Sequence, residues 1–269
     1  MPVTQEAFVL PEANGPNLSA WNDKTADLAF RENKKKHLNP LMKEHGFLQY
    51  NGNRYVRMGK NRIVQTVELQ KMSYGKACTI NVSFFRLDLP TCDYIPYTRI
   101  STLLFVAGKS DRTDFWWSFT EENAEKSFVN MADAIRLFVF PWFEKYEEPV
   151  RYRAMIRSGR TEEMACVSEK LAKRFPGDRR KADTEDTDAA MKRLALYDPD
   201  SIDAPIIRQY LQNRIQFMNP TQQREKNACQ RILDRIDQGI DVETYRRAWI
   251  EANMEIFRFP KGLLKQIAI

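Results

Sequence analysis

Two long runs of alternating apolar and polar residues, at 62–70 and 77–87, constrain the fold of this chain more than any other feature. The apolar residues of one parity are Ile63, Val67 and Leu69 in the first run and Cys78, Ile80, Val82 and Phe84 in the second. Because successive side chains of a strand point to opposite faces, each run predicts a strand. One apolar face and one mostly polar face are typical of an antiparallel sheet that helices cover on one side.

Turn residues mark the ends of the elements next to these strands. Gly46 is placed to end a helix that begins near residue 20, because glycine adopts the left-handed backbone conformation without strain. Asn51-Gly52 lies between two short strand-like segments and predicts a β-hairpin. Asn39-Pro40 predicts a break before the final turns of the first helix.

A further strand and helix are predicted between residues 114 and 143. Residues 114–119 predict the strand, and Thr120 is predicted to cap the helix that follows. The apolar positions of that helix recur at helical spacing and should face the sheet: Ala124, Phe128, Met131, Ile135 and Phe138. Pro141 is expected to end or kink the helix. For residues 100–107 a strand and a short helix both stay open.

Pro149 marks the predicted boundary between two domains. Residues 20–148 predict an α+β domain with an antiparallel sheet packed by helices, after an irregular leader over 1–19. Residues 149–269 show helical spacing and predict an all-α C-terminal domain, with caps at Thr161 and Asp241 and a charged linker over 178–187. We expect residues 20–148 to fold as an independent unit.

Cysteine usage and charge limit the class of protein. The 4 cysteines form no CxxC pair, which favours free thiols in a reducing compartment and predicts a cytoplasmic protein. The N-terminus has no secretory signal, and no apolar run approaches the ~20 residues of a membrane helix. Residues 149–269 carry 23 Lys and Arg against 18 Asp and Glu, whereas residues 1–148 carry 19 against 18. The positive excess therefore lies in the helical half.

Several motifs between residues 41 and 144 resemble a known family. They are Leu41-Met42-Lys43-Glu44-His45-Gly46-Phe47, Asn53-Arg54-Tyr55, Val67-Glu68-Leu69-Gln70-Lys71, Thr79-Ile80-Asn81-Val82, Trp116-Trp117 and Phe140-Pro141-Trp142-Phe143-Glu144. Over roughly residues 25–147 the chain resembles the bacterial domain-of-unknown-function family 4304. The resemblance implies a small α+β domain in a bacterial protein. It implies no activity, since no catalytic residue is assigned to that family.

No motif for catalysis or metal binding stands out. Gly108-Lys109-Ser110 lacks the first glycine of a phosphate-binding loop, because Leu103 occupies that position. His37 and His45 are the 2 histidines, too few for a zinc site without cysteine at ligand spacing. A Cys78–His45 pair stays open, but a buried structural cysteine is the better interpretation. Aspartates near residues 198–203 are explained by caps and turns. We therefore predict no catalytic residue, no metal and no cofactor.

Two groups of residues are candidates for binding a partner. The first would converge on the polar face of the sheet if no second layer covers it: Arg57, Glu68, Gln70 and Asn81. The second lies where the two predicted domains meet and a groove could form: Arg151, Arg153 and Arg157. Arginine is a favoured anchor of protein interfaces.

These observations favour a non-enzymatic module that binds another macromolecule, with an immunity-type or regulatory protein–protein interaction as the first hypothesis. Nucleic-acid binding through the basic helical half is an alternative, since clustered arginines attract phosphate. The same helices also carry acids such as Asp234, Asp237 and Glu243, which favours salt-bridged surfaces instead. An enzyme with an unrecognised site is the remaining alternative.

Overall fold

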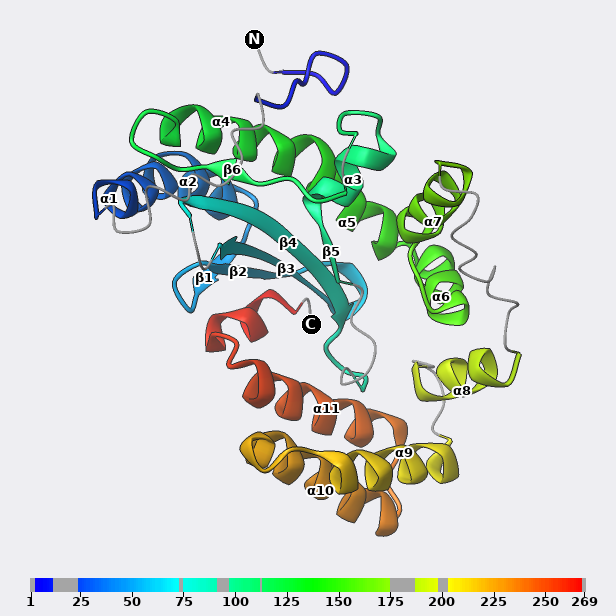
Figure 1. Ribbon diagram of the computed structural model, residues 1–269. Helices are drawn as coiled ribbons and strands as arrows, with labels where there is room; N and C mark the ends of the chain where they lie inside the picture. The colour runs from blue at the N-terminus through cyan, green and yellow to red at the C-terminus, as the bar shows by residue number, and fades with distance from the viewer. Residues whose placement is uncertain are drawn as a thin grey trace.

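A six-stranded antiparallel sheet lies at the centre of the computed structural model, which describes residues 3–11, 24–72, 75–90, 97–111, 113–174, 187–197 and 203–267 (Figure 1). The strands are β1 (Leu48–Tyr50), β2 (Arg54–Met58), β3 (Ile63–Lys71), β4 (Ala77–Arg86), β5 (Tyr97–Arg99) and β6 (Trp117–Ser118). Strands β1 to β5 pair in chain order, and β6 also pairs with β4. The predicted α+β class with an N-terminal antiparallel sheet is confirmed.

The register of β3 and β4 follows the alternation in the sequence. Val67 pairs with Val82, and Leu69 pairs with Ile80. All four side chains are buried in the main core, on the face that the first helices cover. The predicted parity of both strands is therefore correct.

Residues with a left-handed backbone conformation form the tight turns around the sheet. Gly46 (φ +78°) ends the first helical segment, and Asn51 (φ +45°) with Gly52 (φ +73°) joins β1 to β2, so both predicted turns are confirmed. The β2–β3 turn places Asn61 (φ +56°) and Arg62 (φ +58°) in the same region. Two consecutive residues with a Cβ in this conformation cost roughly 1–2 kcal/mol each, so other contacts must hold this turn.

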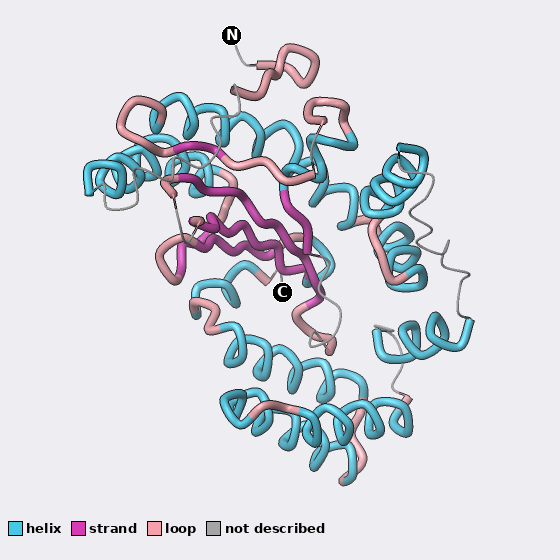
Figure 2. The backbone as a smooth tube through the Cα atoms, viewed as in Figure 1, coloured by secondary structure: helices cyan, strands magenta, loops and turns pink. Residues whose placement is uncertain are grey.

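Two long helical segments cover the first face of the sheet (Figure 2). One comprises α1 (Lys24–Asn33), a π-helical turn (Lys34–Leu38) and α2 (Asn39–Glu44), and the other comprises α4 (Ala124–Ala134), a π-helical turn (Ile135–Val139) and α5 (Phe140–Glu147). The helix continues through Pro40 and Pro141, so neither proline ends it, and a π-helical turn interrupts the regular α-helix just before each one. Asn39 N–H donates to the Lys34 carbonyl and Phe140 N–H to that of Ile135, so an i→i+5 bond widens the turn before the proline. Such a turn accommodates a residue that has no N–H of its own.

The segment between β4 and α4 differs in part from expectation. Residues 100–107, left open between strand and helix, form α3 (Ile100–Val106). The strand expected over 114–119 shrinks to the two residues of β6. The helix after it begins at Ala124, and its N-cap is Asn123 where Thr120 was expected. The carbonyl of Thr120 accepts hydrogen bonds from Asn123 N and Ala124 N, which forms a turn before the helix.

Aromatic side chains fill the core between the sheet and these helices. Phe84 of β4 packs against Trp142 and Tyr146 of α5, with ring centroids 4.8 and 4.9 Å apart. Phe128 is fully buried, as expected, and lies edge-on to Phe30 of α1. The described part of the leader, residues 3–11, has turns rather than helix or strand, and its Phe8 is buried in this core.

In the described residues beyond Pro149, helices are joined by short turns and loops and no strand is present. Its helices are α6 (Pro149–Ser158), α7 (Glu162–Arg174), α8 (Thr187–Tyr197), α9 (Ala204–Phe217), α10 (Gln223–Asp237) and α11 (Val242–Phe257), with short 3₁₀ turns at Pro220–Gln222 and Lys261–Gln266. The predicted caps are present: Thr161 Oγ1 accepts from Met164 N, and Asp241 Oδ1 accepts from Thr244 N. The linker predicted over 178–187 lies outside the described residues except for Thr187, where α8 begins.

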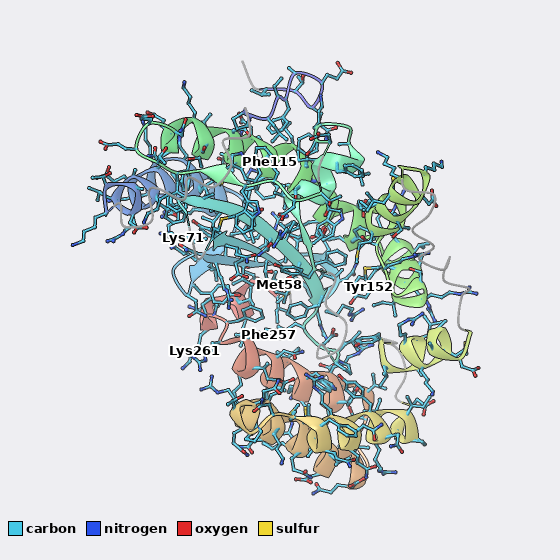
Figure 3. All side chains as sticks on the ribbon, viewed as in Figure 1. Met58, Lys71, Phe115, Tyr152, Phe257 and Lys261 are labelled. Atoms are coloured by element: carbon cyan, nitrogen blue, oxygen red, sulfur yellow. The ribbon has the colours of Figure 1, made fainter. Side chains whose placement is uncertain are left out.

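The second face of the sheet is covered in part by the C-terminal end of the chain. Phe259 and Leu263 pack on Val56, Val64 and Phe85, and together they form a separate hydrophobic cluster. Figure 3 shows Phe257 and Lys261 directly below the sheet, on the side of Met58. The helical half is therefore packed against the sheet, and the independence of residues 20–148 stays a prediction.

Within the described residues, no helix combines the length and the apolar character needed to cross a membrane.

Candidate functional site

Helix α6 lines two neighbouring cavities at the edge of the sheet. It begins at Pro149, a residue suited to a first helical turn because that turn needs no N–H. It ends at Gly159 (φ +71°), whose N–H donates to the Met155 carbonyl. The hydroxyl of Tyr152 accepts a hydrogen bond from Arg86 N at 3.2 Å, which fixes the middle of α6 to β4.

The larger cavity, called the arginine groove below, has a volume of about 960 Å³ and lies between β5, α3, α6, α7 and α8. Its four basic residues are Arg99, Arg157, Arg160 and Arg193. Among the residues that the structure describes, none of those that line the groove is acidic. Tyr97 and Met164 also line it and are 49% and 40% exposed, so the groove combines positive charge with accessible apolar surface.

Specific contacts hold Arg193 and Arg99 at the groove. Arg193 of α8 donates to the carbonyls of Ile156 at 3.1 Å and Arg157 at 2.7 Å. These carbonyls lie in the last turn of α6, where carbonyl groups lack helical partners and the helix dipole is negative. Arg99 pairs with Asp114, and its guanidinium carbon lies 5.2 Å from the ring centroid of Trp116. The groove is therefore a preorganised surface.

A buried carboxylate holds α7, one wall of the groove, against α5. Glu163 accepts hydrogen bonds from Trp142 Nε1 at 3.0 Å, Lys145 Nζ at 2.6 Å and Tyr146 Oη at 2.8 Å. Burial alone would raise the pKa of Glu163, but the bonds from Lys145, the helix backbone and Tyr146 hold this pKa below its ordinary value. Tyr146 Oη also accepts from Glu162 N at 2.8 Å, so the first turn of α7 is doubly attached.

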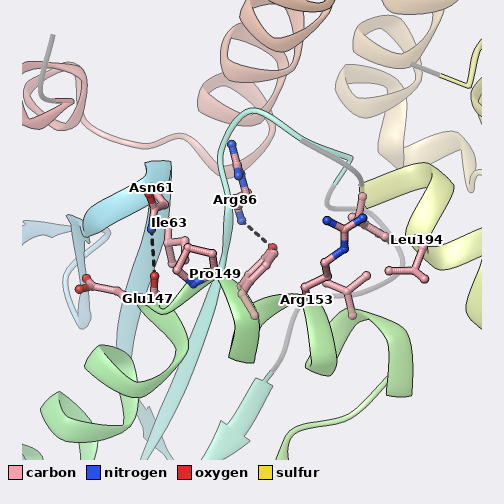
Figure 4. Close-up of a pocket in the computed structure, with 10 residues that line it drawn as sticks. Asn61, Ile63, Arg86, Glu147, Pro149, Arg153 and Leu194 are labelled. Atoms are coloured by element: carbon pink, nitrogen blue, oxygen red, sulfur yellow. Dashed lines mark hydrogen bonds between the residues drawn. The ribbon is translucent and has the colours of Figure 1, made fainter. Parts of the chain in front are cut away.

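The smaller cavity, called the junction pocket below, has a volume of about 230 Å³ and lies on the other side of α6 (Figure 4). Its walls come from the β2–β3 turn, the end of β4, α6 and α8. Arg86 and Arg153 are its basic residues. Arg86 is held by Asp88 through bonds of 3.0 and 2.9 Å, and the Asp88 side chain is fully buried.

A third cavity, the polar cleft, opens near the β2–β3 turn and includes His45, Arg57 and Glu147. Arg57 donates to Gln65 Oε1 at 2.6 Å and to the His45 carbonyl at 2.9 Å. Glu147 Oε1 accepts from Gln65 Nε2 at 2.8 Å. Burial lowers the pKa of His45, and so does the nearby Arg57, which leaves a neutral imidazole at pH 7. Hydrogen bonds therefore join Arg57, Gln65 and Glu147 to one another within the cleft.

The sheet-face candidates separate into two groups. Glu68 bonds to Arg54 at 2.8 Å, and Asn81 donates to Gln70 at 2.7 Å, on the second face of the sheet. Arg57 pairs with Gln65 across β2 and β3 and contacts Phe47 of the main core. The expected convergence of Arg57 with the other three is therefore wrong, because β2 turns its side chain to the opposite face.

The junction candidates lie at the two cavities of α6. Arg153 lines the junction pocket and Arg157 lines the arginine groove. Arg151 is turned to neither cavity and pairs with Glu148 and Glu162, each at 3.1 Å. Arg99 and Arg193 were not predicted as groove residues, because they lie far from α6 along the chain and no local pattern joins them.

Neither the Cys78 thiol nor the arrangement of the described acidic, histidine and cysteine side chains suits nucleophilic catalysis or metal binding. Cys78 is fully buried, its thiol contacts Met131 Sδ at 3.8 Å, and burial raises the pKa of Cys78 to about 12. This thiol is inert at neutral pH, because the thiolate is the reactive form. Among the described residues no cluster of three or more His, Cys, Asp or Glu side chains could hold a metal ion. The aspartates at 198 and 200 lie outside those residues.

Comparison with known proteins gives one match. Residues 38–145 match the family model described as Domain of unknown function (DUF4304). This confirms the resemblance expected from the motifs between residues 41 and 144. The matched segment runs from the end of the first π-helical turn into α5, so it includes Arg99 but ends before α6. The searches of curated proteins and of solved structures found no match.

Proposed function

We propose that this protein is a non-enzymatic binding module that holds an acidic segment of a partner protein in the arginine groove. The observation that carries the proposal is the clustering of four arginines in one cavity whose described lining residues include no acid, although Arg99 also pairs with Asp114 outside that lining. Carboxylates form strong, geometrically specific bonds with the guanidinium fork. A regulatory or immunity-type interaction is the form of function that this surface suits.

The composition of the groove favours a protein over a nucleic acid. Tyr97, Met164 and Val167 lie among the arginines. Arginine, tyrosine and methionine are enriched at protein interfaces, where a few such anchors supply most of the affinity. An acidic segment that also carries apolar side chains would satisfy both kinds of surface.

Salt bridges pair several arginines of the C-terminal helices with acids. Arg208 pairs with Asp237 at 2.7 Å, Arg231 with Glu255 at 2.6 Å, and Arg235 with Glu251 at 3.5 Å. A nucleic-acid interface usually needs a continuous basic surface along the phosphate backbone. Three arginines of the helical half, Arg157, Arg160 and Arg193, meet Arg99 at the groove instead. A cavity of about 960 Å³ can hold a short protein segment.

We also propose that this chain is a bacterial protein and that it acts in the cytoplasm. The described cysteines are free, and Cys78 and Cys229 are buried. Such thiols suit a reducing compartment.

Reversal of charge in the groove tests the proposal. The purified protein is used as bait in a lysate of its native cell, beside the variants Arg157→Glu and Arg160→Glu and a matched control, Arg208→Glu on α9. We expect a protein partner that the wild type and Arg208→Glu retain and that the two groove variants lose. Equal retention by all four baits would contradict the proposal, and retention of nucleic acid alone would favour the alternative.

A further inference from the structure

We propose that the partner segment binds in the arginine groove as an added β-strand, hydrogen-bonded to the free edge of β5. This inference rests on the proposed function for the presence of a bound protein segment, and it adds the conformation and the position of that segment. Its evidence is the backbone of β5 and not the charge of the arginines. The occupant is an extended segment whose own backbone completes the sheet.

Strand β5 is the last strand on one side of the sheet. It pairs with β4, and the described strands give it no neighbour on its other side. Its three residues, Tyr97, Thr98 and Arg99, all line the arginine groove. Figure 1 shows β5 on the side of the sheet nearest to α6 and α7, which form other walls of the groove. The free edge of the sheet therefore borders the groove.

The hydrogen bonds between β3 and β4 determine which backbone groups of β4 face β5. In an antiparallel pair of strands, hydrogen-bonded residue pairs alternate with pairs that share no bond. Leu87 N donates to the Arg62 carbonyl at 2.9 Å, so these two residues form a bonded pair at the end of the ladder. Every second residue of β4 counted from Leu87 therefore bonds to β3, and this set includes Ser83 and Asn81. The backbone of Val82 lies in the alternate set and points toward β5.

The same alternation leaves one set of β5 backbone groups without a partner. Thr98 pairs with Val82, so the N–H and the carbonyl of Thr98 face β4. Tyr97 and Arg99 then turn their N–H groups, and Tyr97 its carbonyl, away from the sheet. Among the described residues, none donates to or accepts from these three groups. An unpaired edge of this kind is a template for pairing with another chain.

The groove has room for a short strand beside this edge. Its volume of about 960 Å³ lies at the upper end of the range of about 300–1,000 Å³ for ligand sites. Successive side chains of an added strand point to opposite faces of the sheet. One set would lie beside Tyr97, which is 49% exposed. Because β5 has three residues, it offers few backbone bonds, and the side chains must supply the remaining affinity.

N-methylated peptides test the strand geometry at constant charge. The probe is a fluorescein-labelled hexapeptide of alternating glutamate and valine. Two isomers carry N-methyl groups either on the three glutamate nitrogens or on the three valine nitrogens. In an added strand alternate N–H groups face β5, so one isomer loses its bonds to the edge and the other keeps them. A shift by one residue does not rescue the first isomer, because it exchanges glutamate and valine between the two faces.

Dissociation constants are measured by fluorescence anisotropy with the full chain. We expect saturable binding of the unmethylated peptide, binding of one isomer within about twofold of it, and binding of the other at least about tenfold weaker, since two or more hydrogen bonds are lost. Equal weakening of both isomers, or weakening of neither, would overturn the added strand. So would a failure of the unmethylated peptide to bind, in which case the lysate experiment still judges the proposed function.

A matched pair of variants tests the same edge from the side of the protein. Arg99→Ala and Arg99→Pro both remove the guanidinium and its pair with Asp114, but only proline also removes the outward N–H. The backbone of Arg99 (φ −86°, ψ +147°) is close to the conformation of proline, and an outward N–H is the position where an edge strand accepts it. Thermal unfolding of both variants is the control for the fold. Arg99→Pro should bind the unmethylated peptide about fivefold more weakly than Arg99→Ala, and equal affinities would contradict the added strand.

A hexapeptide with glutamine in place of glutamate separates this inference from the proposed function. It should bind at least about tenfold more weakly than the acidic peptide, because each charge-assisted bond becomes a neutral one. If it binds equally well while the two N-methyl isomers of the acidic peptide differ, the added strand stands and the acidic nature of the partner is wrong. If it binds weakly while the isomers do not differ, the acidic partner stands and the added strand is wrong.

Discussion

Asn253 of α11 donates its side-chain amide to the carbonyl oxygens of Leu87, at 2.8 Å, and Leu89, at 3.0 Å. Asn253 is fully buried, so this amide attaches the helical half to the chain that leaves β4. The two carbonyls lie beyond the end of the strand, where the sheet ladder gives them no partner. The contact therefore connects two parts of the chain that were predicted to be different domains.

Asn253→Ala should lower the free energy of unfolding by about 1–3 kcal/mol, because it leaves buried carbonyls without their donor. Urea denaturation followed by circular dichroism measures the change. Asn227→Ala, at an exposed position of α10, is the control and should stay within about 0.5 kcal/mol of wild type. A wild-type stability in Asn253→Ala would show that water replaces the amide at no cost.

The carboxylate of Glu163 predicts a pH dependence of stability. Its pKa is lowered in the folded protein, so the ionised form stabilises the fold above the ordinary pKa of 4.5, and this stabilisation is lost as pH falls through the lowered value. Glu163→Gln should therefore be less stable than wild type at neutral pH, and the difference should shrink between about pH 6 and about pH 3. Urea titrations at several pH values test this, with the exposed Glu169→Gln on the same helix as control. A difference that does not vary with pH would contradict the account.

Gly59 allows Glu147 to approach the β2–β3 turn. A Cβ at this position would lie 2.1 Å from Glu147 Oε1 and 2.7 Å from Gln65 Nε2. The backbone of Gly59 (φ −89°, ψ −169°) is in the extended region that alanine also adopts, so the clash alone determines the effect. Gly59→Ala should cost about 1–3 kcal/mol through the displaced carboxylate and its lost hydrogen bonds.

A double-mutant cycle isolates that clash. In a Glu147→Ala background, Gly59→Ala should cost clearly less than it does alone, because the main obstacle is gone. Additive effects of the two substitutions would mean that glycine is required there for another reason.

Phe259 covers the second face of the sheet. Its ring lies 5.5 Å from Tyr50 and 6.1 Å from Phe85, centroid to centroid, and the residue is 7% exposed. Phe259→Ala should cost about 3–5 kcal/mol, as for other aromatic core sites. Leu264→Ala, in the same C-terminal segment but 41% exposed, should cost far less. Similar stabilities of the two variants would show that this layer contributes little.

Local patterns in the sequence predicted much of the fold. The alternation of β3 and β4, the glycine that ends α2, the Asn51-Gly52 hairpin and the Asp241 cap each depend on residues close together in the chain. Such features follow from backbone geometry and need no knowledge of distant contacts. Pro141 shows where this approach fails, because a π-helical turn lets the helix continue through a residue that normally interrupts it.

The candidate site depended on contacts that no local pattern contains. Alternation fixes the parity of side chains within a strand, but the position of Arg57 relative to Glu68 depends on the register between β2 and β3. The second layer on the sheet comes from Phe259 and Leu263, about 200 residues beyond the strands they cover. Arg99 and Arg193 could not be predicted as site residues for the same reason, since only the folded chain brings them to α6.

The central claim is that the arginine groove holds an acidic segment of a partner protein. Tyr97, a half-exposed residue of the groove, is replaced by the photo-crosslinking amino acid p-benzoylphenylalanine, and Phe217, 79% exposed at the end of α9, is replaced in a matched control. Both proteins are irradiated in the native cell, and the adducts are digested and sequenced by mass spectrometry. The account predicts an adduct at position 97 to one protein, through a peptide rich in Asp and Glu, that is absent at position 217 and lost when Arg157→Glu is added. Adducts to nucleic acid, or the same adducts at both positions, would contradict it.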